Sequence, residues 1–236
     1  YFITVVDALG CTDSDSVFVS EPELLQISNV LIQNVNCYDS ADGELTVQHV
    51  GGTSPFTYLW NDPLTQTTVT AIGIEPGSYN VIVTDTMGCS DTSITVTVTQ
   101  PDSLYISSIT STSVLCNGGS NGTATVIVAG GTSGYNYNWN TGGTNSIDSN
   151  LIAGNYTVNV TDANGCFKSA SIIVSEPSPI TATFIKDSVT CVGGNDGWAT
   201  VLASGGVGVY SYLWQNGSTT NTANNLNAGY HKVIIK

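Results

Sequence analysis

Gly154-Asn-Tyr-Thr-Val-Asn-Val-Thr-Asp-Ala-Asn-Gly-Cys166 is the stretch that decides the fold. It joins a Gly-x-Tyr opening, a short run in which apolar and polar residues alternate, and an Asp-x-x-Gly-Cys turn. The same pattern occurs at 77–89, and parts of it occur at 1–11 and 229–236. A pattern that recurs in this way predicts a tandem array of one small domain.

Other landmarks set the length of the repeat. Trp60, Trp139 and Trp214 are 79 and 75 residues apart, and Glu-Pro or Gln-Pro pairs recur at a similar interval. With these pairs as boundaries, we expect the C-terminal part of one repeat, two complete repeats and a truncated repeat, at residues 1–22, 23–101, 102–177 and 178–236. A repeat of this length can form a small independent domain.

Composition separates this chain from nucleic-acid-binding proteins. It has 4 basic and 18 acidic residues, which give a net charge of −14, and it contains no arginine. Nucleic-acid binding requires cations that neutralise phosphates, so we expect no such partner. A polyanionic surface rich in Ser, Thr, Asn and Gly favours a soluble, secreted chain. The sequence contains no apolar run long enough to span a bilayer and no signal peptide.

The periodicity predicts strands and no helices. In the middle repeat, apolar and polar residues alternate within strands expected at 104–115, 123–129, 135–139, 156–161 and 168–175, with short strands between 140 and 150. About seven such strands per repeat indicate an antiparallel sandwich. The predicted fold class is therefore all-β, with tandem immunoglobulin-like β-sandwich repeats arranged as an elongated rod.

Recurring aromatic residues mark the expected cores. An immunoglobulin-like sandwich buries a tryptophan on its third strand, and a tyrosine at one corner bonds back to the backbone upstream. We therefore expect Trp60, Trp139 and Trp214 to be buried. The corner tyrosines, which we also place in the core, are Tyr1, Tyr79, Tyr156 and Tyr230.

Six cysteines recur without the spacing of a metal site, which favours disulfides formed in an oxidising compartment. They are Cys11, Cys37, Cys89, Cys116, Cys166 and Cys191. Strand length separates the two cysteine-bearing turns of one repeat by roughly 25–30 Å, more than a disulfide can bridge. We therefore favour the inter-repeat pair Cys37–Cys166. Within-repeat pairs, Cys37–Cys89 and Cys116–Cys166, and free thiols remain open as alternatives.

The motifs of the middle repeat resemble a known family. Cys116-Asn-Gly, Gly130-Gly-Thr, Tyr137-Asn-Trp139 and Val160-Thr-Asp-Ala-Asn-Gly-Cys166 are similar to the SprB-type repeat of large Bacteroidetes cell-surface adhesins. The first repeat departs with Cys37-Tyr-Asp, and the last has Val207 where Thr is expected. The resemblance implies a gliding-motility filament at the cell surface, exported across the outer membrane by type IX secretion. Its partners would be neighbouring repeats, surface polysaccharide or substratum, and the secretion and motility machinery.

The same resemblance gives a meaning to five Asp-Ser and Asp-Thr pairs. Bacteroidetes O-glycosylate secreted proteins at such pairs when an aliphatic or similar residue follows, although the pairs also form ordinary turns. The candidate sites, all expected in turns and linkers, are Ser16, Ser40, Thr86, Ser103 and Ser188.

No catalytic constellation stands out. His49 and His231 do not recur between repeats, and the sequence contains no nucleophile elbow or phosphate loop. We expect no enzyme and no cofactor; Asp85 and Asp162, at recurring turns, are weak candidates for calcium ligands. The sequence thus predicts a non-catalytic stalk segment. The alternatives are a repeat that binds polysaccharide and a segment of a self-assembling surface fibre.

Overall fold

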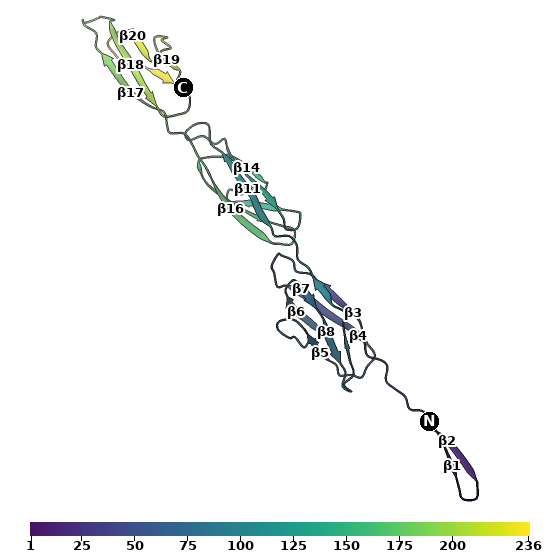
Figure 1. Ribbon diagram of the computed structural model, residues 1–236. Coiled ribbons are helices and arrows are strands. Elements are labelled where there is room, and N and C mark those ends of the chain that lie inside the picture. Colours follow the sequence, from purple (N-terminus) through teal and green to yellow (C-terminus); the bar gives the residue numbers. More distant parts are fainter. The chain divides into compact units, whose positions relative to one another are not determined.

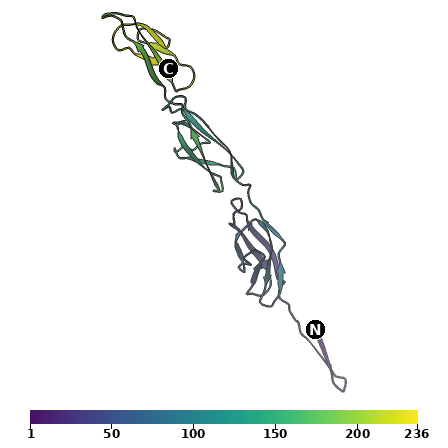
Figure 2. The ribbon, with the colours of Figure 1, turned by 60° about the vertical axis from the view of Figure 1, so that its left-hand side comes forward.

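The computed structural model describes residues 1–236 and contains strands without helices (Figures 1 and 2). It therefore has no helix that is long and apolar enough to cross a membrane. The chain forms two compact units. One comprises residues 1–103, 130–132 and 164–166, and the other comprises residues 104–129, 133–163 and 167–236.

The first unit begins with a two-stranded hairpin. Strands β1 (Phe2–Val6) and β2 (Thr12–Ser16) are antiparallel, pair with no other strand, and are exposed throughout. Figure 2 shows them as a pair joined by a tight turn. The prediction that Tyr1 lies in a core is wrong: its side chain is 88% exposed, because no second sheet packs against the hairpin.

The first unit also contains a sandwich within the repeat predicted at 23–101. One sheet has the order β3-β4-β6, and the other has the order β5-β8-β9, with β10 paired to β7. The bounds are β3 Gln26–Gln33, β4 Gly43–Val50, β5 Thr57–Trp60, β6 Thr70–Ile74, β7 Gly77–Tyr79, β8 Val81–Thr84, β9 Ser90–Thr92 and β10 Val96–Val98. Leu45 from one sheet and Trp60 and Val83 from the other meet in one buried cluster.

The second unit contains the sandwich of the repeat predicted at 102–177. Its sheets have the orders β11-β12-β14 and β13-β15-β16. The bounds are β11 Tyr105–Thr112, β12 Gly122–Ala129, β13 Asn136–Trp139, β14 Ile147–Leu151, β15 Gly154–Thr161 and β16 Phe167–Val174. Strand β12 ends before Gly130 and Gly131, which have φ of 70° and 63°, values that cost a glycine little. The core joins Val126 to Trp139 and Val158.

The same unit holds the strands of the repeat predicted from 178 onwards. The sheets are β17-β18-β20 and β19-β21, with bounds β17 Thr181–Asp187, β18 Gly197–Ser204, β19 Tyr212–Trp214, β20 Thr222–Leu226 and β21 Val233–Ile235. The core is smaller than in the other two repeats and is made of Val201, Trp214, Ala223 and Leu226.

The two facing sheets, with a buried tryptophan on each of β5, β13 and β19, form tandem immunoglobulin-like sandwiches. The middle repeat has six strands where the sequence predicts about seven. Between β13 and β15 only β14 forms, because the Gly- and Asn-rich segment before it makes turns. Trp60, Trp139 and Trp214 are each at most 3% exposed, as the alternation of these strands requires.

Candidate functional site: the cysteine turns and the domain corners

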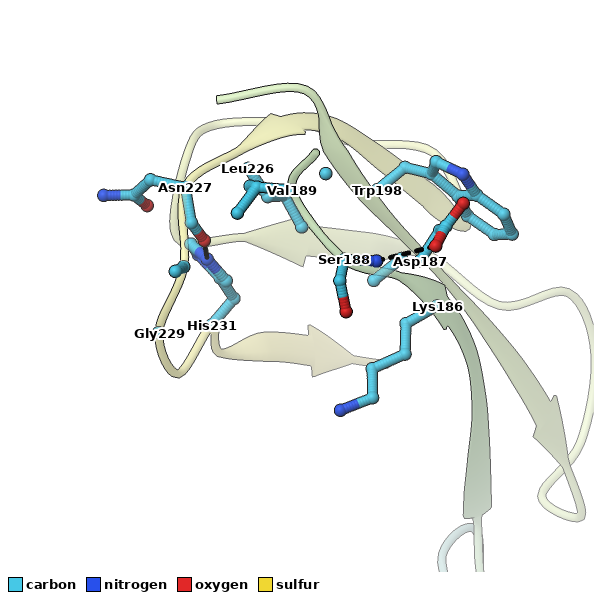
Figure 3. A pocket seen from close by; sticks show the side chains of 12 residues that line it. Lys186, Asp187, Ser188, Val189, Trp198, Leu226, Asn227, Gly229 and His231 are labelled. Atoms are coloured by element: carbon cyan, nitrogen blue, oxygen red, sulfur yellow. Dashed lines mark hydrogen bonds between the residues drawn. The ribbon is translucent and has the colours of Figure 1, made fainter. Parts of the chain in front are cut away.

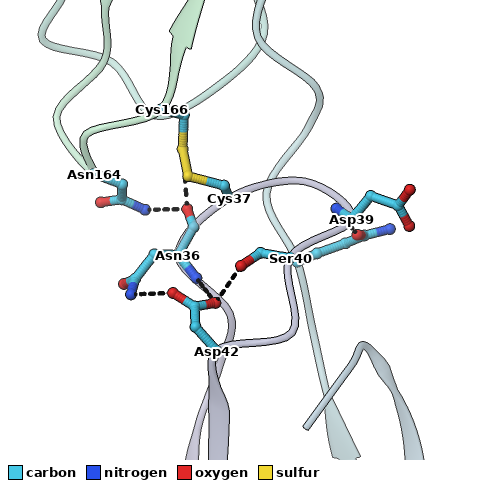
Figure 4. Close-up of a disulfide and its surroundings, with 8 residues drawn as sticks. Asn36, Cys37, Asp39, Ser40, Asp42, Asn164 and Cys166 are labelled. Carbon is cyan, nitrogen blue, oxygen red and sulfur yellow. Dashed lines mark hydrogen bonds between the residues drawn. A yellow bond between two sulfur atoms is a disulfide. The ribbon is translucent and has the colours of Figure 1, made fainter. Parts of the chain in front are cut away.

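The turn at 36–42 connects β3 to β4 and is organised by one carboxylate (Figure 4). Oδ1 of Asp42 accepts hydrogen bonds from the Asn36 N–H at 3.1 Å and from the Ser40 hydroxyl at 2.7 Å. Oδ2 accepts the Asn36 side-chain amide at 2.6 Å. The Ser40 hydroxyl, followed by the Asn36 amide, lowers the pKa of Asp42 below its ordinary 3.8. Asp42 therefore fixes the turn that holds Cys37.

The corresponding turns of the other repeats use the same device. Asn121 Oδ1 accepts the Leu115 N–H at 3.0 Å, and Asp196 Oδ1 accepts the Thr190 N–H at 3.1 Å. An amide oxygen serves as well as a carboxylate because the required acceptor is a single oxygen. The acidic residues at these positions are thus structural acceptors in their own turns.

A second carboxylate organises the turn at 85–89. Oδ1 of Asp85 accepts the N–H groups of Met87 and Cys89, each at 2.9 Å, and Oδ2 accepts the Thr53 N–H at 3.0 Å. Burial raises the pKa of Asp85, but the amides of Thr53, Cys89 and Met87 outweigh burial, and the pKa lies below 3.8. In the hairpin turn, Oδ1 of Asp7 likewise accepts the main-chain N–H groups of Leu9 and Cys11.

These contacts bear on the calcium candidates. Both Asp85 and Asp162 are buried, with 6% and 2% of their surface exposed, and the oxygens of Asp85 already accept main-chain amides. A calcium ion would need six to eight oxygen ligands. No group of three or more His, Cys, Asp or Glu side chains in residues 1–236 could hold a metal ion.

Cys37 and Cys166 form a disulfide with their Cα atoms 5.7 Å apart, across a sequence separation of 129 (Figure 4). This is the inter-repeat pair favoured from the sequence. The alternatives Cys37–Cys89 and Cys116–Cys166 are wrong, because Cys89 and Cys116 are free and exposed, as are Cys11 and Cys191. The side-chain amide of Asn164 also donates to the carbonyl oxygen of Asn36 at 2.9 Å. The link therefore joins residues of the first and second repeats both covalently and through a hydrogen bond.

The tyrosine corner is present in two repeats. The Tyr79 hydroxyl donates to the carbonyl oxygen of Glu75 at 3.0 Å, and the Tyr156 hydroxyl donates to that of Ile152 at 2.9 Å. Both rings are 7% exposed. The corner therefore closes the sandwich edge with a buried ring and a main-chain bond, as in immunoglobulin domains.

In the third repeat the predicted corner residue is wrong. Tyr230 is fully exposed, and the next residue, His231, takes the position instead. Its Nε2–H donates to the carbonyl oxygen of Asn227 at 2.9 Å, four residues back, as Tyr156 does to Ile152. The spacing of 75 residues between Trp139 and Trp214, applied to Tyr156, gives position 231. The tryptophan spacing therefore indicates position 231 for the corner, whereas residue type alone indicates Tyr230.

The two histidines are engaged in separate repeats. His49 Nε2 lies 3.1 Å from the Tyr58 hydroxyl, and its ring packs beside Phe56 with centroids 4.3 Å apart. His231 occupies the corner described above. The ring nitrogens of the two histidines thus contact a tyrosine hydroxyl in one case and a main-chain carbonyl oxygen in the other.

The glycosylation candidates lie in different surroundings. Ser16, Thr86, Ser103 and Ser188 are exposed. Ser40 is half-buried, and its hydroxyl donates to Asp42. Ser16 ends strand β2, so the expectation that all five lie in turns or linkers is wrong for this residue.

Comparison with known proteins adds a family match. Three stretches match the family model of the SprB repeat, at residues 29–65, 108–144 and 183–219. No curated protein matches the sequence.

Solved structures with a similar chain path are distant in sequence. The N-terminal eight Ig domains of Down Syndrome Cell Adhesion Molecule share 13% identity with a TM-score of 0.41, and the match covers 99% of this chain and 42% of that one. Extracellular domains 3–5 of Drosophila OTK share 13% identity with a TM-score of 0.29, over 92% and 97% of the two chains. The FN1-FN3 domains of chicken CNTN1 share 13% identity with a TM-score of 0.25, over 91% and 97%. The present chain thus spans less than half of the first of these fragments.

Proposed function

Because this chain carries three SprB repeats, we propose that it is a non-catalytic stalk segment of a large cell-surface adhesin of the gliding-motility type. The repeats would extend as a rod and hold an adhesive region away from the cell. Location at the cell surface, export by type IX secretion and glycosylation at Ser16, Thr86, Ser103 or Ser188 belong to the same proposal. They rest on the family resemblance.

The observation that supports a stalk is the Cys37–Cys166 disulfide. It connects the β3–β4 turn of the first repeat to the β15–β16 turn of the second, so tension applied to one is passed to the other through a covalent bond. Neighbouring repeats in an array interact mainly with each other. A link between successive repeats therefore serves a protein whose task is to transmit force over length.

The surface chemistry also fits a stalk better than a binding module. Tyr58, Tyr135, Tyr137 and Tyr212, which could stack on sugar rings, pack against the three buried cores instead. Tyr210 lies outside these cores, and its hydroxyl bonds to the Gly205 carbonyl oxygen.

Small-angle X-ray scattering tests the rod. A compact globule of 236 residues would have a radius of gyration of about 18 Å. Sandwiches of roughly 35–45 Å each, placed end to end, would give about twice that value. A measured radius close to that of the globule would refute the stalk.

A glycan array distinguishes the stalk from a polysaccharide-binding repeat. The labelled chain should bind no glycan above background. Saturable binding that Tyr210→Ala removes, while Tyr230→Ala leaves it intact, would refute the stalk and favour the binding module. Both tyrosines belong to the third repeat, which makes them a matched pair.

A further inference from the structure

The second repeat is joined to the third by a short segment, Glu176-Pro177-Ser178, in which every residue is hydrogen-bonded. Oε2 of Glu176 accepts the Gly118 N–H at 2.7 Å, and the Pro177 carbonyl oxygen accepts the side-chain amide of Asn117 at 3.2 Å. Both donors lie in the β11–β12 turn of the second repeat. The Ser178 carbonyl oxygen accepts the Gly206 N–H of the third repeat at 2.8 Å. The segment is therefore tied to the repeat before it and to the repeat after it.

The same arrangement recurs at Gln100-Pro101-Asp102, which joins the first repeat to the second. Oε1 of Gln100 accepts the Asp39 N–H of the β3–β4 turn at 2.8 Å, and the Asp102 carbonyl oxygen accepts the Gly131 N–H at 2.9 Å. Glutamine and glutamate thus do the same work, because the N–H donor needs only one acceptor oxygen. We call these two segments the Glx-Pro-x joints.

The glycine pairs that follow β4 and β18 have to admit the main chain that leaves a joint. Gly51 and Gly205 have φ of 66° and 81°, which only glycine adopts at little cost. A Cβ added to them would stand 2.1 Å from the Leu24 carbonyl oxygen and 2.0 Å from that of Pro179. Each pair is therefore a socket for the chain that enters its repeat.

A buried valine anchors the strand that leads into each joint. Val174 is 1% exposed, and a Cβ added at Gly122 would stand 2.6 Å from its Cγ1; Val98 packs in the same way in the first repeat. In the third repeat the corresponding glycine, Gly197, lines a recess of about 240 Å³ (Figure 3), since the position that corresponds to Val174 lies outside residues 1–236. The recess thus belongs to such a strand.

The spacing of the bonds decides how freely a joint can move. Each bond is modest by itself, because water competes for the same groups. However, the bonds fall on the first and third residues of the segment, and the proline ring fixes φ of the residue between them at about −65°. Proline also restricts the residue before it. A segment with so little freedom loses little entropy when it is ordered.

We propose that the Glx-Pro-x segments are fixed joints, in which Gln100 and Glu176 are positioning residues that stop successive repeats from swivelling. The glutamine or glutamate side chain ties the joint to the repeat before it, and a main-chain carbonyl oxygen ties it to the glycine socket of the repeat after it. The proposal concerns the motion of neighbouring repeats and does not depend on whether the array is an adhesin stalk.

Pulsed electron paramagnetic resonance tests the second joint, which the Cys37–Cys166 disulfide does not span. Ile127→Cys and Leu202→Cys place spin labels at equivalent positions of β12 and β18, where the native side chains are 56% and 48% exposed. Serine replaces the four free cysteines. We expect one narrow distribution of distances. Glu176→Ala should broaden it and should speed exchange of the Gly118 amide hydrogen by about tenfold, because a bond to a carboxylate is lost.

Three further variants separate the joint from a general effect of charge. Glu176→Gln should keep the distribution narrow, since Gln100 supplies the same oxygen at the first joint. Pro177→Gly should broaden it, because φ is no longer fixed. The matched control is Glu75→Ala, which removes the same charge from an exposed position of the first repeat and should change nothing.

The proposal would be overturned by a parent distribution as broad as that of Glu176→Ala. Broadening by Glu176→Gln or by Glu75→Ala to the same extent would overturn it as well, since the acceptor oxygen would then not be what holds the joint. A chain with mobile joints can still be long, so the radius of gyration tests the stalk function separately.

Discussion

The Cys37–Cys166 disulfide should prevent a defined length of the chain from extending under a stretching force. When the chain is pulled from its two ends, tension passes directly from residue 37 to residue 166 through the bond. The intervening residues, which include strands β4–β15, then lie outside the path of the force. Replacing both cysteines by serine returns them to that path.

The magnitude follows from the sequence separation of 129. An extended chain spans about 3.3–3.6 Å per residue, so these residues contribute roughly 430–460 Å of extension once they unfold. With the disulfide intact the same interval spans only the 5.7 Å between the two Cα atoms. The double serine variant should therefore unfold to a contour length greater by about 440 Å.

Single-molecule pulling between terminal handles measures this length directly. Cys116→Ser provides the matched control, since Cys116 is free and exposed in a turn of the same kind as that of Cys37. It should leave the contour length unchanged. Equal lengths for the parent chain and the Cys37→Ser, Cys166→Ser variant would show that the bond does not form and would refute the reasoning.

Three further outcomes are expected. Tyr156→Phe should lower the free energy of local unfolding of the middle repeat by about 0.5–1.5 kcal/mol, since it removes one hydrogen bond to Ile152; hydrogen exchange of the β15 amides measures this. Because the pKa of Asp85 is lowered from 3.8, its contribution to stability is present above that value and is lost as pH falls through the folded-state pKa. In Asp85→Asn the exchange protection of β8 should therefore be weaker at neutral pH and lose its acid dependence. A chelator should leave the melting temperature unchanged, because the Asp85 oxygens already accept amides; a clear drop would show a bound calcium ion.

Much of the fold could be predicted because it depends on local pattern. Alternation places the strands of the middle repeat within a few residues, and the recurring tryptophans, which donate from Nε1 to carbonyl oxygens at 2.8–3.0 Å, lie in the cores. These features require only that each strand present one apolar face. Strand ends such as that of β12 at Ala129 follow from the glycine pair behind it.

The errors concern features that depend on partners or on exact register. Tyr1 has the sequence of a corner residue, but burial requires a second sheet, which the β1–β2 hairpin lacks. At the last corner a one-residue shift moves the role from Tyr230 to His231, whose ring nitrogen replaces a hydroxyl as donor. Residue type alone could not show this substitution, whereas the spacing from the tryptophan could have done so.

The Cys37–Cys166 bond also makes the topology of the chain depend on the redox state of its surroundings. Thiols in the cytosol are kept reduced, so a bond of this kind persists only in an oxidising compartment. With reduced thiols the chain is an open thread, whereas the bond closes a ring between residues 37 and 166. While that ring is closed, the segment cannot be drawn out as a single extended strand.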